Sequence, residues 1–76
     1  MFSEEIRRLL QDRPFVPFEV HVAEVRVLRV PHTDYALLNP QGTAMTIMDE
    51  RGVFNHVAVA HVTRVVPLEQ ESAAAR

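Results

Sequence analysis

The stretch that decides the fold is Tyr35-Ala36-Leu37-Leu38-Asn39-Pro40-Gln41-Gly42-Thr43-Ala44-Met45-Thr46-Ile47-Met48. Its middle, Asn39-Pro40-Gln41-Gly42, has proline second and glycine fourth, which predicts a type I β-turn. A short apolar run precedes the turn. After it, Ala44, Thr46 and Met48 alternate with Met45 and Ile47, the period of a half-buried strand. The stretch therefore predicts two antiparallel strands joined by a tight turn.

The same pattern continues toward the C-terminus. Asp49-Glu50-Arg51-Gly52 is a polar loop closed by glycine, and it predicts a short hairpin between residues 43–48 and a strand over 53–58. Residues 58–61 predict a tight helical turn. The last strand covers residues 62–66 and ends at Pro67, which cannot donate to a strand ladder.

Toward the N-terminus, Phe18, Val20 and Val22 alternate with polar residues and predict a strand. Residues 25–30 continue this composition as far as Pro31. The linking residues, 23–25, include none that favours the positive φ of a two-residue hairpin. Two alternatives stay open, a longer turn here or one long bent strand over 18–30, and the turn is favoured.

The N-terminal residues predict a helix of about ten residues, a typical length for a short globular helix. Ser3 is the expected N-cap, and Glu4 and Glu5 follow where the helix dipole favours acids. Apolar residues at i, i+3 and i+4 form one stripe, and Pro14 ends the run. The stripe consists of Ile6, Leu9 and Leu10.

Length and composition indicate one small domain over residues 1–68, followed by a disordered tail over 69–76. The chain has 76 residues, 47% of them hydrophobic and 24% charged, and no cysteine. Neither a disulfide nor a thiolate metal site can therefore supplement the small core, and subunit association is the remaining supplement. We expect a homo-oligomer.

Charge and hydropathy limit the classes of partner that we expect this protein to bind. The net charge is −2, and all eight basic residues are arginine, so a general polyanion-binding surface is not indicated. No apolar run approaches the roughly 20 residues that cross a bilayer, and the first residues are acidic rather than basic. We expect a cytoplasmic protein without a membrane partner.

The predicted fold is mainly β, an N-terminal helix followed by a five-stranded, strongly bent antiparallel sheet or small barrel of Sm-like or SH3-like type. Five short strands with one apolar face each bury that face best when the sheet closes on itself. A flat open sheet covered by the helix is the alternative.

This layout resembles the Sm-like family, which includes the bacterial RNA chaperone Hfq and the eukaryotic Sm proteins. The likeness covers residues 3–67 and rests on the order of elements, on Asp34-Tyr35-Ala36-Leu37-Leu38 and on Val65-Val66-Pro67. The chain is also similar to a group of small bacterial proteins without an assigned activity that begin with a helix and an Arg-Pro-Phe segment, here residues 13–15. The first resemblance implies rings of subunits and binding of single-stranded RNA.

The RNA-binding residues implied by that resemblance combine arginines with a stacking aromatic ring. Tyr35 stands where Hfq stacks a base, whereas the Lys-His pair of its pocket falls on Val59 and Ala60. His61 is one position out of register. The candidate residues are Tyr35, Arg26, Arg29, Arg64 and His61.

No catalytic or metal-binding motif accompanies them. His21, His32, His56 and His61 show none of the spacings typical of metal ligands, so we expect neither a metal nor a cofactor. Ser3 is explained as a helix cap. The sequence thus predicts a non-enzymatic, self-associating binding module, with an Sm-like single-stranded RNA-binding protein as the alternative.

Overall fold

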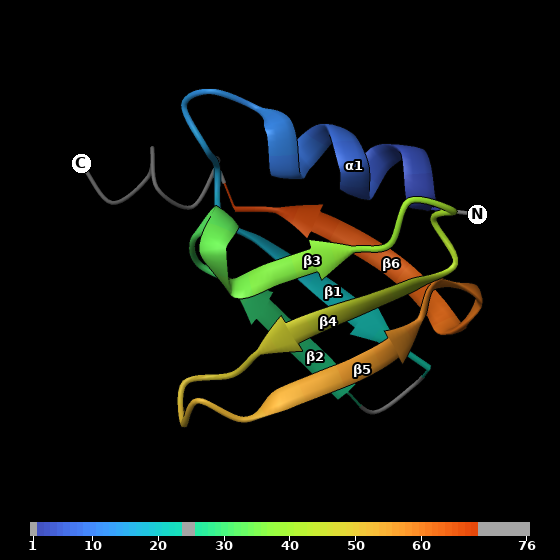
Figure 1. Ribbon diagram of the computed structural model, residues 1–76. Helices are drawn as coiled ribbons and strands as arrows, with labels where there is room; N and C mark the ends of the chain where they lie inside the picture. Colours follow the sequence, from blue (N-terminus) through green and yellow to red (C-terminus); the bar gives the residue numbers. More distant parts are fainter. Residues whose placement is uncertain (1, 24–25, 69–76) are drawn as a thin grey trace.

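The computed structural model describes residues 2–23 and 26–68, which form one α-helix and six strands (Figure 1). In chain order these elements are α1 (Ser3–Gln11), β1 (Phe18–Val22), β2 (Arg26–Val30), β3 (Ala36–Leu38), β4 (Ala44–Met48), β5 (Phe54–Ala58) and β6 (Val62–Pro67). Two short 3-10 helices, η1 (Thr33–Tyr35) and η2 (Val59–His61), precede β3 and β6. None of the described helices is long and apolar enough to cross a membrane.

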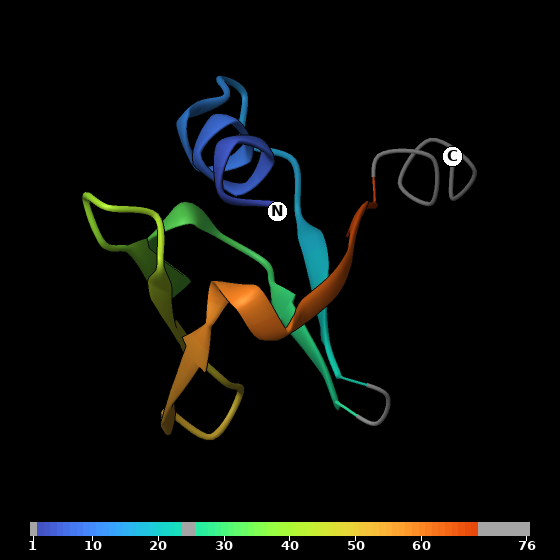
Figure 2. The same cartoon turned by 90° about the vertical axis from the view of Figure 1, so that its right-hand side faces the viewer.

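The strands form two antiparallel three-stranded sheets, with orders β2-β1-β6 and β3-β4-β5. The sheets face each other, and α1 lies over one end of the space between them (Figure 2). Side chains alternate across each strand, so each sheet turns one apolar face inward. The core lies between these two faces and the underside of the helix.

The core consists of aliphatic side chains from every element together with Phe18. Ile6, Phe18 and Ile47 are fully buried and come from the helix and from both sheets. Ile6 and Leu9 are the buried part of the predicted helical stripe, and Leu10 packs partly against the core. In the second sheet, Met45 and Ile47 point inward as their alternation predicts.

The predicted turns are confirmed. The Gly42 N–H donates to the Asn39 carbonyl at 3.0 Å, and the Gly52 N–H donates to the Asp49 carbonyl at the same distance. Both glycines have positive φ, +76° and +82°, which glycine adopts without strain. The predicted helical turn before the last strand is also confirmed, as η2.

The first two strands form a hairpin in which Val22 opposes Arg26, which decides against one long bent strand. Ala23 begins the turn with φ of 53°. Glu24 and Val25 lie outside the described residues, as does the tail over 69–76.

Two predictions about the sheet are wrong. The described chain has six strands rather than five, and they form two separate sheets rather than a closed barrel or one flat sheet. The division into two sheets has its cause between Val30 and Ala36. Pro31 has no N–H for a strand ladder, and Thr33–Tyr35 form η1, so Tyr35 lies in a 3-10 helix instead of a strand.

The predicted N-cap is also wrong. The helix begins at Ser3, its N-cap residue is Phe2, and no side chain caps it. The Ile6 N–H instead donates to the Phe2 carbonyl at 2.9 Å. Ser3 packs against the turn at Gly42, where a Cβ would lie 2.9 Å from the Ser3 Cβ, so its side chain makes a tertiary contact rather than a cap.

Candidate functional site

Two of the five predicted RNA-binding residues meet at one pocket. Arg29 and Tyr35 line a pocket of about 230 Å³ together with Pro31, Met48 and Glu50. β2 supplies the arginine, η1 supplies the tyrosine, β4 supplies Met48, and the β4–β5 turn supplies Glu50. The break at Pro31 creates this pocket, because it turns the chain from one sheet toward the other.

Arg26 has a structural partner instead. Its Nη2 donates to Oδ1 of Asn55 at 2.7 Å, which joins β2 of one sheet to β5 of the other. The Asn55 Nδ2 donates in turn to the Ile47 carbonyl at 3.2 Å. Arg26 therefore holds the two sheets together at this end and is not directed to the Tyr35 pocket.

Arg64 and His61 lie apart from that pocket. Arg64 is exposed on β6 and opposes His21 on β1, on the outer face of their sheet. His61 is exposed in η2, where its carbonyl accepts a hydrogen bond from the Ala23 N–H at 2.9 Å. Neither residue lines a pocket with Tyr35, so the five predicted residues do not form one RNA-binding surface.

Three histidines contact neighbouring polar groups. His21 Nε2 lies 3.2 Å from Oε1 of Glu19, and His56 Nδ1 lies 3.0 Å from Oγ1 of Thr46. His32 Nδ1 accepts from the Asp34 N–H at 3.3 Å. Within residues 2–23 and 26–68, no group of three His, Asp or Glu side chains could hold a metal ion.

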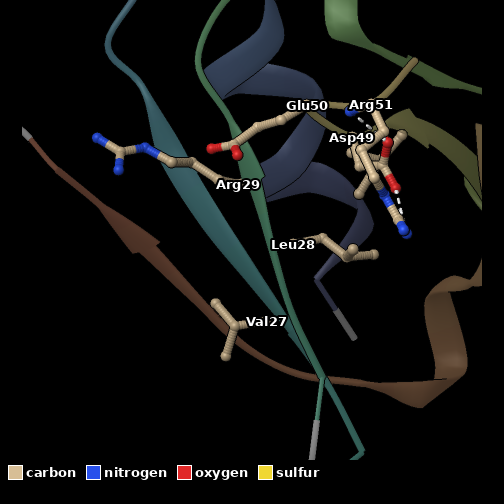
Figure 3. A pocket seen from close by; sticks show the side chains of 7 residues that line it. Val27, Leu28, Arg29, Asp49, Glu50 and Arg51 are labelled. Atoms are coloured by element: carbon tan, nitrogen blue, oxygen red, sulfur yellow. Dashed lines mark hydrogen bonds and ion pairs between the residues drawn. The ribbon is translucent and has the colours of Figure 1, made fainter. Parts of the chain in front are cut away.

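A second pocket, of about 260 Å³, adjoins the Tyr35 pocket and shares Arg29 and Glu50 with it. It lies between β2 and the β4–β5 turn, and Glu50 extends from that turn toward Arg29 (Figure 3). We call the two adjoining pockets the β2 groove. Its lining residues are Val27, Leu28, Arg29, Pro31, Tyr35, Ile47, Met48, Asp49, Glu50 and Arg51.

The β4–β5 turn that forms one wall of the groove is fixed by Asp49. Its Oδ1 accepts from the Arg51 N–H at 2.9 Å and from the Val53 N–H at 3.0 Å. The hydrogen bond from Val53 is the largest cause that holds the pKa of Asp49 below its ordinary 3.8, and Arg51 adds to it. Arg51 Nη2 also lies 3.6 Å from Oδ2 of Asp49. This wall is therefore a defined structure and not a loose loop.

A different surface covers the outer side of the β3-β4-β5 sheet, and we call it the apolar face. Leu37 on β3 is 75% exposed and Phe54 on β5 is 64% exposed. The strand register places five further residues on the same side, none of them Asp, Glu, Lys or Arg. The full set is Leu37, Ala44, Thr46, Met48, Phe54, His56 and Ala58.

Sequence reasoning missed both surfaces. Residues 35–38 are all apolar, so their pattern could not show that Leu37 faces solvent while Ala36 is buried. The groove joins residues from two sheets, whose relative placement no local pattern encodes. The sequence contains one signal for the apolar face. In the strand over residues 43–48, the alternating set that faces outward, Ala44, Thr46 and Met48, contains no charged residue.

Comparisons with protein-family models, with curated proteins and with solved structures found no match. The family resemblances noted in the sequence therefore stay predictions. Function has to be inferred from the geometry of the apolar face and of the β2 groove.

Proposed function

We propose that this protein is a non-enzymatic, self-associating binding module whose two facing sheets form an open, bent β-structure of Sm-like or SH3-like type. The observation that carries the proposal is the apolar face, with Leu37 and Phe54 exposed to 75% and 64%. Large exposed apolar side chains that gather on one face of a small domain often mark a contact surface for a partner. The Sm-like or SH3-like assignment is supported by strand order, since β6-β1-β2 continues along the chain into β3-β4-β5 through the bend at Pro31.

A second copy of this chain is the occupant that the face fits. The face carries no carboxylate or guanidinium, so it has no such group to attract a partner of opposite charge. A second face of the same composition can pack against it without repulsion between like charges. Two copies that pack their faces together also enlarge a core that is small for a lone chain of 76 residues. At the border of the face, β5 is a sheet edge, available for further pairing.

A binding role is supported by the placement of the titratable groups. No histidine lines the β2 groove, and its Asp49 is already engaged by backbone N–H groups. A general base must lie within reach of the proton that it removes, in a site that a substrate can enter. Tyr35 and Glu50 also line the groove, which offers contact surface and charge for a bound partner.

Sedimentation velocity over micromolar to submillimolar concentrations tests the proposal with Leu37→Ser/Phe54→Ser. Burial of a Leu or Phe side chain is worth about 1.5–3 kcal/mol, so the double variant should raise the dissociation constant at least about 100-fold. Val27→Ser is the matched control, since Val27 is 53% exposed but lies on the other sheet. Far-ultraviolet circular dichroism checks that all variants fold. A wild-type chain that stays a folded monomer throughout this range would refute the proposal.

The alternative is binding of single-stranded RNA, and one observation favours it: the Tyr35 ring and the Arg29 guanidinium belong to the same pocket. Such a pair can stack a base and contact a phosphate. Glu50 in that pocket and the net charge of −2 oppose it. Fluorescence anisotropy with a short uridine-rich RNA at low salt tests it. Binding that is lost in Tyr35→Ala and kept in Tyr35→Phe supports the alternative, and no binding at low salt dismisses it.

A further inference from the structure

The β2 groove lies along the free edge of a strand. Val27, Leu28 and Arg29 are consecutive residues of β2, and all three line the same pocket. Because successive side chains point to opposite faces of a sheet, a pocket that touches three in a row lies beside the strand and not on one face. Among the described residues β2 pairs only with β1. Its other row of N–H and C=O groups therefore borders the groove.

An edge strand beside a groove is the arrangement that binds an extended peptide by adding it as a further strand. The opposite wall of the groove is the β4–β5 turn, which Asp49 fixes through two backbone hydrogen bonds. The groove consists of two pockets, of about 260 and 230 Å³, which share Arg29 and Glu50. A peptide strand that pairs with β2 would contact both pockets.

The side chains around the groove define the chemistry of that peptide. Alternate peptide residues would point inward over Leu28 and Ile47, which are buried and apolar. The residues between them would point outward beside Arg29, which is exposed and forms no ion pair with any described residue. Inward positions therefore favour valine or isoleucine, and the outward position at Arg29 favours a carboxylate.

We propose that the β2 edge and the β4–β5 turn bind an extended peptide with alternating apolar and acidic residues, which joins the β2-β1-β6 sheet as a fourth strand. Main-chain hydrogen bonds to β2 provide the affinity, and Arg29 selects a peptide carboxylate at the position beside it by forming an ion pair. Glu50 lies in the same groove and opposes the acidic peptide, so the two charged residues act with opposite sign. The proposal does not depend on self-association, because it uses neither Leu37 nor Phe54.

Fluorescence anisotropy with three labelled peptides tests it: alternating Val and Glu, the same peptide with Lys for Glu, and the Glu peptide with a central proline. The Glu peptide should bind at micromolar to submillimolar concentration, and the Lys peptide about two- to fivefold more weakly, the range of an exposed ion pair. The proline peptide should not bind, because it loses a ladder hydrogen bond and its proline ring interrupts the strand.

Two exposed variants complete the test. Arg29→Gln should abolish or reverse the preference for the Glu peptide, because Glu50 remains and attracts the Lys peptide, and Glu50→Gln should strengthen binding of the Glu peptide about two- to fivefold. Arg64→Gln is the matched control, an exposed arginine on the opposite edge strand of the same sheet. No binding of the Glu peptide at about 1 mM would overturn the proposal. The proposal would also be overturned if the proline peptide bound as tightly as the Glu peptide, or if Arg29→Gln preferred the Glu peptide as strongly as the wild type does.

Discussion

The contact between the helix and the β3–β4 turn makes one substitution pair informative. Gly42 and Gly52 occupy equivalent places in two turns, with φ of +76° and +82°. An alanine at either site must adopt the left-handed conformation, which lowers the free energy of unfolding by about 1–2 kcal/mol. Because alanine also restricts the unfolded chain, about 0.4–1 kcal/mol of this loss is recovered. Gly52→Ala should therefore lower the free energy of unfolding by about 1 kcal/mol.

Gly42→Ala should cost clearly more. Its Cβ would lie 2.9 Å from the Ser3 Cβ and 3.2 Å from the Arg7 Nη2, whereas a Cβ at Gly52 has no neighbour within 4 Å. Relief of such a contact requires the start of the helix to move, and overpacking of this kind costs about 1–3 kcal/mol. For a domain of this size each kcal/mol lowers the melting temperature by about 4–8 °C.

Urea unfolding and thermal melts followed by circular dichroism measure the difference between the two variants. Ser3→Gly is the third variant to measure, because it removes the Ser3 Cβ and Oγ and leaves only the contact with the Arg7 Nη2. In that background the excess cost of Gly42→Ala should fall by at least about 1 kcal/mol, a coupling typical of residues in contact. Equal destabilisation by the two alanines, or an unchanged cost in the Ser3→Gly background, would refute the packing of the helix on this turn.

Two further predictions concern the hairpin turn and the joint between the sheets. The folded pKa of Asp49 lies below 3.8, so its carboxylate stabilises the fold above that pH, and the stabilisation is lost as the pH falls through the folded pKa. Asp49→Asn keeps the acceptor oxygen, so its urea midpoint should fall less than that of the wild type between about pH 5 and pH 3; parallel declines would contradict this. Arg26→Ala and Asn55→Ala should show a coupling of about 0.5–1.5 kcal/mol in a double-mutant cycle, and additivity would show that their 2.7 Å hydrogen bond contributes nothing.

The elements of this fold were predictable where the signal is local. Asn39-Pro40-Gln41-Gly42 contains its own turn chemistry, and Phe18, Val20 and Val22 show the period of a strand, so both could be identified from neighbouring residues alone. The hairpin of β1 and β2 was favoured although residues 23–25 lack a turn signal. In the structure Ala23 takes a positive φ, at 53°, which a non-glycine residue adopts only when the surrounding pairing requires it.

The division into two sheets could not be predicted from the same rules. It depends on Pro31, whose effect is local, and on the direction in which η1 then sends β3, which is set by packing against the rest of the core. The candidate site shares this dependence. Arg29 and Tyr35 were both named from the sequence, yet their meeting with Glu50 follows from the placement of the second sheet. Arg26 was named for its charge, and the structure engages it with Asn55.

Self-association through the apolar face would bring several β2 grooves into one assembly, which matters for peptide binding. The apolar face lies on the outer side of β3-β4-β5, the groove runs beside β2 of the other sheet, and Met48 belongs to both surfaces. An assembly would then present one groove per copy, and weak single sites gain avidity when a partner carries repeated strands. Loss of association in the Leu37/Phe54 double variant with peptide binding unchanged would establish two independent surfaces. Loss of both would place the groove at the subunit contact.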